Sequence, residues 1–227
     1  MPSVLITGAN RGIGLEFARQ YAAAGWRVFA ACRDPARAKD LKELKGDVRV
    51  YALDIGDFMA INVLARELEG EAIDVLVNNA GVYGPGPQTL ESLDYDGWAE
   101  TFRIDCMAQI RMSRAFLDHV ARSERKVIVA LTSKMGSIDD NSGGGAYIYR
   151  SCKAALNAAF KSLAIDVAPR GIVAAVIHPG WVMTDMGGPN ALISAAESVT
   201  AMRALIGRFT PRDSGRFWAY DGKEIPW

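Results

Sequence analysis

The chain has 227 residues, half of them hydrophobic, and its 26 Lys and Arg residues balance its 26 Asp and Glu residues. This length supports a hydrophobic core without metals or disulfide bonds, which excludes a small metal- or disulfide-stapled scaffold. A formal net charge of zero provides no long-range attraction to phosphate backbones or anionic lipids, so we expect neither nucleic-acid nor membrane binding.

The start of the chain and its cysteines favour a soluble cytoplasmic protein. No signal-peptide pattern precedes the first hydrophobic run, at residues 4–6. The longest apolar stretch, residues 171–183, is broken by His178, Pro179 and Gly180 and is shorter than the ~20 residues that cross a bilayer. Three widely spaced cysteines are typical of reduced thiols, and the two histidines have no cysteine nearby, so we expect no metal site.

Short β-branched segments alternate with longer helical patterns along the whole chain. In chain order we expect a strand at Ser3–Thr7, a helix at Gly12–Ala24, a strand at Arg27–Cys32, a helix at Asp34–Lys45, a strand at Val48–Leu53, a helix at Asp57–Glu69, a strand at Ile73–Asn78, a helix at Trp98–Ala121, a strand at Lys126–Thr132, a helix at Ala146–Ala168, a strand at Ile172–His178, a helical stretch within Pro189–Phe209 and a strand at Arg216–Tyr220.

The strands are continuous apolar runs, which indicates a parallel sheet covered on both faces. Right-handed crossovers between such strands give a single-domain α/β Rossmann fold over residues 1–227, with a doubly wound sheet of about seven strands. We expect the ligand crevice at the carboxyl ends of the strands, with a short substrate lid at about residues 183–215.

The first strand–helix junction contains a glycine cluster, Thr7-Gly8-Ala9-Asn10-Arg11-Gly12-Ile13-Gly14. Glycines there allow a tight turn and let the backbone approach a pyrophosphate, whose charge meets the N–H groups of the following helix. The position of this cluster between a strand and a helix favours a dinucleotide site over an ordinary tight turn.

The end of the second predicted strand indicates which dinucleotide binds. An NAD site expects an acidic residue there to hold the ribose hydroxyls, whereas this chain has Cys32 followed by Arg33. A guanidinium can bind a 2′-phosphate, and Arg11 could add a second positive charge. Arg33 could instead be an ordinary solvated arginine, but the missing acid favours NADP(H) over NAD(H).

Tyr149 and Lys153 lie four residues apart in a predicted helix and therefore on one face. An ammonium beside a phenol favours the phenolate and brings a tyrosine closer to useful acid–base range. Tyr147 lacks such a partner, because Ser151 stands four residues after it. Taken alone, a Tyr–Lys pair is more often a surface packing contact.

In combination, these motifs resemble the short-chain dehydrogenase/reductase family over essentially the whole chain. The resemblance rests on TGxxxGxG at residues 7–14, Asn78-Asn79-Ala80-Gly81 after the fourth strand, Ser133 after the fifth, and YxxxK at residues 149–153. Residues 141–145, 178–186 and 220–227 further resemble the carbonyl reductases of the C-factor/sniffer type.

The resemblance implies a role for each matching residue. Tyr149 would donate a proton to the carbonyl, Ser133 would hydrogen-bond the substrate oxygen, and Lys153 would bind the nicotinamide ribose and lower the pKa of the tyrosine. The implied cofactor-binding residues are Gly8, Asn10, Arg11, Gly12, Ile13, Gly14, Arg33, Asp54, Ile55, Asn79, Ala80, Gly81, Tyr149, Lys153, Pro179, Gly180, Val182 and Thr184.

The chain departs from the family pattern at two places. Asp105 stands where the family has a catalytic asparagine, and its charge could pair with Lys153 and weaken the effect of that lysine on Tyr149; it could equally be a simple polar replacement. The interval from Ser133 to Tyr149 is also longer than is common, which leaves Ser137 as a second candidate for the substrate oxygen.

The expected function is NADPH-dependent reduction of a ketone, aldehyde or quinone-like carbonyl. One alternative is an NAD-linked alcohol dehydrogenase, and another is a cofactor-binding signalling protein of the C-factor type with little catalysis. Apolar residues near the strand ends, among them Tyr83, Met135 and Trp181, favour a pocket for an apolar substrate. As is common in the family, we expect a homodimer or homotetramer that associates through the helices at 98–121 and 146–168.

Overall fold

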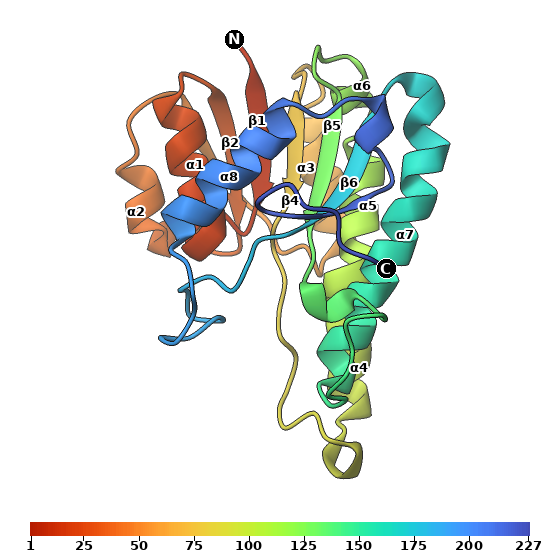
Figure 1. Ribbon diagram of the computed structural model, residues 1–227. Helices are drawn as coiled ribbons and strands as arrows, with labels where there is room; N and C mark the ends of the chain where they lie inside the picture. Colours follow the sequence, from red (N-terminus) through yellow and green to blue (C-terminus); the bar gives the residue numbers. More distant parts are fainter.

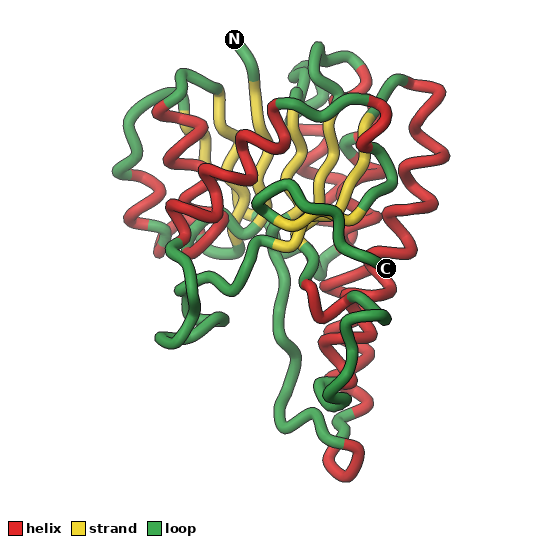
Figure 2. The backbone as a smooth tube through the Cα atoms, viewed as in Figure 1, coloured by secondary structure: helices red, strands yellow, loops and turns green.

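The computed structural model describes residues 1–227 and contains one open sheet with helices on both faces (Figures 1 and 2). All neighbouring strands are parallel, in the order β3-β2-β1-β4-β5-β6-β7. The strands are β1 (Ser3–Thr7), β2 (Arg27–Cys32), β3 (Val48–Ala52), β4 (Val75–Asn78), β5 (Val127–Leu131), β6 (Val173–His178) and β7 (Phe217–Ala219). The predicted doubly wound sheet is confirmed.

Eight α-helices surround this sheet. They are α1 (Gly12–Ala23), α2 (Lys39–Lys42), α3 (Phe58–Glu67), α4 (Tyr95–Phe102), α5 (Ala108–Ala115), α6 (Leu117–Ala121), α7 (Tyr147–Val167) and α8 (Ala195–Gly207). None of them is long and apolar enough to cross a bilayer.

Two hydrophobic cores lie on opposite faces of the sheet, because successive strand residues point to opposite sides. In β1, Val4 and Ile6 pack with residues of α1, α2 and α8, whereas Leu5 packs with residues of α3, α5 and α7. Burial on both faces explains why the strands are apolar throughout rather than alternating.

Two predicted helices differ from the structure. The segment 34–45 is not one helix: Asp34 caps a short 3₁₀ turn at Pro35–Arg37, the backbone of Ala38 then leaves the helical region with ψ of +62°, and only the four-residue α2 follows. The predicted helix at 98–121 begins earlier, at Tyr95, where Asp94 accepts a hydrogen bond from the N–H of Gly97 at 2.9 Å. A π-helical turn at Arg103–Met107 interrupts it, and a further break at Phe116 separates α5 from α6.

The strand order switches direction between β1 and β4. Chain connections therefore diverge at the carboxyl ends of these strands, which form the lower edge of the sheet in Figure 1. The segment between β6 and α8 hangs below this edge (Figure 2), as do α4 and the first turns of α7. Residues 195–207 of the predicted lid form α8, which packs against α1 and the sheet, so residues 183–194 remain the candidate lid.

Candidate active site and cofactor site

The glycine loop joins β1 to α1 by a turn that requires glycine. Gly8 and Gly12 have φ angles of +65° and +54°, a conformation that side chains disfavour. A Cβ atom at Gly14 would lie 2.3 Å from the carbonyl oxygen of Gly8, so only glycine lets α1 begin this close to β1. The N-cap residue Arg11 makes no side-chain cap, which leaves the first N–H groups of α1 open to an anionic ligand.

The residues that follow β4 are tied to the end of β1. The backbone N–H groups of Asn79 and Ala80 both donate to the Thr7 hydroxyl at 3.0 Å, and the Asn79 amide donates to the Thr7 carbonyl at 2.8 Å. A Cβ atom at Gly8 would lie 3.0 Å from Cα of Ala80. The glycine loop and the Asn79-Ala80-Gly81 segment therefore form two adjoining walls of the candidate cofactor site.

The segment after β6 forms a third wall. A Cβ atom at Gly12 would meet the Thr184 methyl group at 3.3 Å, so Thr184 faces the glycine loop. Arg11 also reaches this segment, with Nη1 2.7 Å from Oδ2 of Asp185. Val182, in the same segment, is buried.

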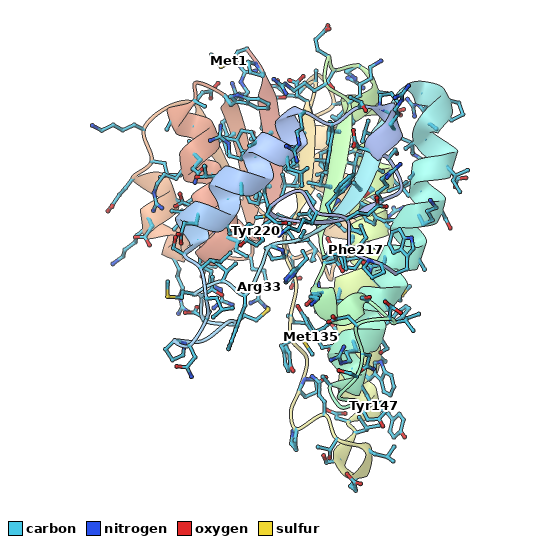
Figure 3. All side chains as sticks on the ribbon, in the orientation of Figure 1. Met1, Arg33, Met135, Tyr147, Phe217 and Tyr220 are labelled. Atoms are coloured by element: carbon cyan, nitrogen blue, oxygen red, sulfur yellow. The ribbon has the colours of Figure 1, made fainter.

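Arg33 is exposed at the end of β2, below the sheet in Figure 3. Its acidic neighbour Asp34 is engaged elsewhere, because it accepts hydrogen bonds from the N–H groups of Ala36 and Arg37 and pairs with the Arg37 side chain at 3.5 Å. Asp54, exposed after the adjacent strand β3, accepts a hydrogen bond from the N–H of Gly56 at 2.9 Å.

These residues fit a dinucleotide. The glycine cradle and the open N–H groups of α1 suit a pyrophosphate, and the Arg33 guanidinium suits a ribose 2′-phosphate beyond it. The structure brings the predicted residues of five separate segments to one edge of the sheet. Because Arg11 is paired with Asp185, Arg33 is the better candidate for the 2′-phosphate.

Tyr149 and Lys153 face the same edge from the first half of α7 and are both buried. Lys153 Nζ lies 5.6 Å from the centre of the Tyr149 ring and donates to the Leu131 carbonyl at 3.3 Å. Ser133 follows β5, and its hydroxyl accepts a hydrogen bond from the N–H of Met135 at 3.2 Å. Its side chain is near enough to Tyr149 to lower the pKa of the phenol. The structure thus brings Ser133, Tyr149 and Lys153 together.

Asp105 lies in the π-helical turn and is completely buried. Its Oδ2 is 2.9 Å from Lys153 Nζ, and its Oδ1 accepts a hydrogen bond from the N–H of Val82 at 2.8 Å. The Gln109 amide donates to the carbonyl of Ile104 at 3.1 Å, which satisfies a group that the π turn removes from the regular helical pattern. The pairing of Asp105 with Lys153 matches the charge effect considered from the sequence.

The pKa of Tyr149 is raised above its ordinary value. Burial is the largest cause; the Lys153 ammonium lowers this pKa, Asp105 raises it, and a hydrogen bond with Ser133 lowers it. Lys153 thus acts in the predicted direction, but burial outweighs it. Burial also lowers the pKa of Lys153, yet Asp105 and Tyr149 raise it more. At neutral pH the site therefore holds a protonated phenol beside an ammonium.

Ser133 is the better candidate than Ser137 for the substrate oxygen. The two hydroxyls each accept one backbone hydrogen bond at 3.2 Å, Ser133 from the N–H of Met135 and Ser137 from the N–H of Asp140. Ser133 differs in that its side chain lowers the pKa of Tyr149, which places it beside the phenol. Asn157 holds this loop, because its amide donates to the Gly136 carbonyl at 3.3 Å and its oxygen accepts from the Thr132 hydroxyl at 2.7 Å.

Large apolar side chains remain exposed around the site. The Tyr83 ring lies 4.7 Å from the Tyr149 ring, and Figure 3 shows Met135 below the strand ends, near the first turns of α7. A hollow of about 160 Å³ lies between the loop after β5 and α7, and Met135 and Arg150 line it. A larger hollow of about 380 Å³ is formed by α3 and α5, and none of the candidate site residues lines it.

The sequence did not indicate the residues that hold the site together. Thr7, Gln88, Gln109 and Asn157 each bond to a catalytic or cofactor-binding segment through a side chain. Except for Thr7, which opens the glycine motif, none lies in a recognisable pattern. Their partners can be far away in the chain, as in the contact of Gln88 with Tyr149 across 61 positions.

Comparison with known proteins identifies the family. Residues 2–192 match the family model described as short chain dehydrogenase. The chain is 44% identical to C-signal of Myxococcus xanthus over 155 residues. The aligned region covers 68% of this chain and 93% of that protein.

Two solved structures are similar over the full chain. Carbonyl reductase Sniffer of D. melanogaster has a TM-score of 0.94 at 32% identity and is covered over its whole length. The NADPH-bound carbonyl reductase from chicken fatty liver has a TM-score of 0.91 at 33% identity, with 99% of that chain covered.

The chain belongs to the short-chain dehydrogenase/reductase family and is an NAD(P)-dependent oxidoreductase. Its relatives include C-signal and Sniffer, as the sequence indicated.

Proposed function

We propose that this oxidoreductase uses NADPH to reduce a ketone, aldehyde or quinone-like carbonyl to an alcohol. The observation that carries the proposal is the buried Tyr149 phenol at the carboxyl ends of the strands, with the Lys153 ammonium 5.6 Å from its ring centre and the Ser133 side chain near enough to lower its pKa. When bound, NADPH supplies the hydride. The protein supplies a proton, a hydrogen bond and the position of the substrate.

Each of the three residues has a distinct role in this proposal. Tyr149, protonated at neutral pH, donates its proton to the substrate oxygen. Ser133 donates a hydrogen bond to the same oxygen and stabilises the negative charge that develops there. Lys153 holds the nicotinamide ribose, and its charge favours the phenolate that remains after proton transfer. In the reverse direction that phenolate accepts the proton from an alcohol.

The test replaces the proton donor and compares it with a neighbouring tyrosine. We expect Tyr149→Phe to lower kcat for carbonyl reduction by about 10²- to 10⁴-fold, the usual contribution of a general acid. NADPH binding, measured by fluorescence titration, should change little. Tyr147→Phe removes an exposed hydroxyl two residues away and should leave kcat within about twofold. A Tyr149→Phe enzyme with the parental rate would contradict the proposed mechanism.

NADP(H) is proposed over NAD(H) because an arginine rather than an acid follows β2, and because its acidic neighbour Asp34 caps its own turn. The similar chicken reductase binds NADPH. The alternative, an NAD-linked alcohol dehydrogenase, predicts equal or better turnover with NADH.

A second candidate is a cofactor-binding signalling protein, and the 44% identity to C-signal favours it. A protein of this kind could bind NADPH and show no turnover. Ser133, Tyr149 and Lys153 are all present at one site, which favours the enzyme. Assays of the purified protein with NADPH on a panel of ketones, aldehydes and quinones separate the two: NADPH binding without consumption of any carbonyl would favour the signalling function.

A further inference from the structure

Gln88 connects the loop after β4 to the first turn of α7. It is buried, with 7% of its surface exposed. Its Nε2 donates to the carbonyl of Tyr83 at 2.8 Å, and its Oε1 accepts a hydrogen bond from the N–H of Tyr149 at 2.9 Å. Reversing the amide would set donor against donor and acceptor against acceptor, so only one orientation satisfies both partners.

The start of α7 has no local support of this kind. Its N-cap residue, Ala146, is in the left-handed conformation, with φ of +46°, and makes no side-chain cap. The preceding Gly144 and Gly145 also have positive φ angles and are exposed, and a Cβ atom at either position would have no neighbour within 4 Å. The N–H groups of a first helical turn have no partner within their own helix. Gln88 therefore supplies the N–H of Tyr149 with an acceptor from another part of the chain.

The loop that carries Gln88 is anchored to the site at its other end as well. The N–H of Val82 donates to Asp105 at 2.8 Å, and the Tyr83 ring lies 4.7 Å from the Tyr149 ring. Gly84 permits a close approach, since a Cβ atom there would lie 3.0 Å from a methyl group of Ile148 in α7. Residues 82–88 thus run alongside the first turn of α7 and contact both the backbone and the ring of Tyr149.

We propose that Gln88 is a positioning residue that holds the first turn of α7, and with it the Tyr149 phenol, against Ser133 and Lys153. The inference rests on the proposed function, in which Tyr149 delivers the proton. Both polar atoms of the Gln88 amide are occupied by backbone groups, so Gln88 acts on the reaction through Tyr149. Its amide fixes the backbone from which the proton donor projects, and a displacement of about 1 Å at a reacting group is enough to slow a reaction by as much as 100-fold.

Kinetics of two Gln88 variants test this role. Gln88→Met keeps the length and removes both hydrogen bonds, and we expect kcat to fall by about 10- to 100-fold, with NADPH affinity changed less than about threefold. Gln88→Glu keeps an acceptor for the N–H of Tyr149 but sets a carboxylate oxygen against the Tyr83 carbonyl, so it should recover part of that loss. Thr89→Val, which removes an exposed hydroxyl from the adjacent position, should leave kcat unchanged.

Hydrogen exchange provides a readout that does not depend on turnover. The Tyr149 amide should exchange at least about tenfold faster in Gln88→Met than in the parent, while the amide of Phe160, in the middle of α7, keeps its rate. If Gln88→Met does not fold, Gln88→Glu is compared with Thr89→Val: the Tyr149 amide should remain protected in both.

The outcomes separate this inference from the proposed function. An inactive Tyr149→Phe together with a Gln88→Met enzyme of parental kcat overturns the role of Gln88 alone. A fully active Tyr149→Phe overturns the proposed function. The Tyr149 amide could also exchange as fast in Gln88→Glu as in Gln88→Met. That result would count against the role of Gln88, because the retained acceptor would then have no effect.

Discussion

Asp105 introduces a negative charge into the buried part of the site, where the family pattern has asparagine. Its carboxylate is 2.9 Å from Lys153 Nζ, and the nearby negative charge raises the pKa of Tyr149 by disfavouring the phenolate. The proposed proton donor is therefore kept protonated by its neighbours as well as by burial. This favours reduction, which consumes the phenolic proton, over a wider range of alkaline pH.

Asp105→Asn tests this electrostatic effect. Removing the carboxylate leaves the Lys153 charge less opposed, so the pKa of Tyr149 should fall relative to the parent. Reduction requires the protonated phenol and is lost as the pH rises through that pKa. We therefore expect the alkaline decline of kcat to begin at a lower pH than in the parent. Asp96→Asn, an exposed substitution in α4, should leave the profile unchanged. A decline at the same or higher pH in Asp105→Asn would contradict the assignment.

Arg33 determines cofactor preference in the proposed function. Arg33→Ala should lower kcat/KM for NADPH by about 10- to 100-fold, because a charge-assisted contact to the 2′-phosphate is lost, and should change kcat/KM for NADH little. The matched control is Arg37→Ala, since Arg37 is exposed nearby but paired with Asp34. Steady-state kinetics with both cofactors decide the matter. Equal losses with NADPH and NADH, or equal effects of both substitutions, would remove Arg33 from the 2′-phosphate site.

At the scale of elements, the junction of β1 and α1 depends on close approach. Gly14 lies in the first turn of α1, directly against the Gly8 carbonyl, and the Asn79 amide packs on the same point. Three segments meet there: the glycine loop and the Asn79-Ala80-Gly81 segment, which form two walls of the candidate cofactor site, and α1, whose N-terminus faces that site. The packing of α1 against β1 and the geometry of the cofactor site therefore depend on the same residue.

Gly14→Ala should affect both properties together. The added Cβ would lie 2.3 Å from the Gly8 oxygen, and relief of this overlap requires α1 to move. We expect the free energy of unfolding in urea to fall by about 1–3 kcal/mol and NADPH affinity to fall more than about tenfold. Gly207→Ala, at the end of α8 with no atom within 4 Å, is the matched control and should not destabilise the protein. A Gly14→Ala protein with parental stability and affinity would show that α1 can shift freely.

At the scale of the whole molecule, α4, the π turn and α7 carry exposed apolar side chains. Phe102 of α4 and Met107 of the π turn are exposed, as are Tyr147 and Ile165 of α7. The helices α4 and α7 pack against each other. Exposed apolar side chains on helices that pack together suit a surface covered by another copy of the chain. We propose that copies of the chain associate through these helices.

Light scattering coupled to size-exclusion chromatography measures this association. We expect a mass of two or four times the 24.6 kDa of one chain, and a shift toward that single-chain mass when Met107 is replaced by Lys. Ile138→Lys places the same charge at an exposed apolar residue outside these helices and should not change the mass. A mass of 24.6 kDa at assay concentrations would rule out a stable oligomer.

The sequence by itself determined the strand order along the chain, the parallel sheet and the residues that carry the motifs. Local physical constraints explain this success, since apolar runs fix buried strands and Gly8, Gly12 and Gly14 mark a turn that only glycine permits. The spacing of Tyr149 and Lys153 likewise follows from helical geometry. The predicted helix at 34–45 is wrong because the backbone of Ala38 leaves the helical region, with ψ of +62°, and separates the turn capped by Asp34 from α2.

Only the tertiary structure decided how the site is held and charged. The net direction of the Tyr149 pKa depends on burial, and burial depends on residues from several segments that meet at the site. The ion pair of Asp105 with Lys153, the engagement of Arg11 by Asp185 and the support of Tyr149 by Gln88 join positions from 48 to 174 residues apart. Such contacts leave no periodic signal in a single sequence, because they depend on distances that exist only after the sheet has formed.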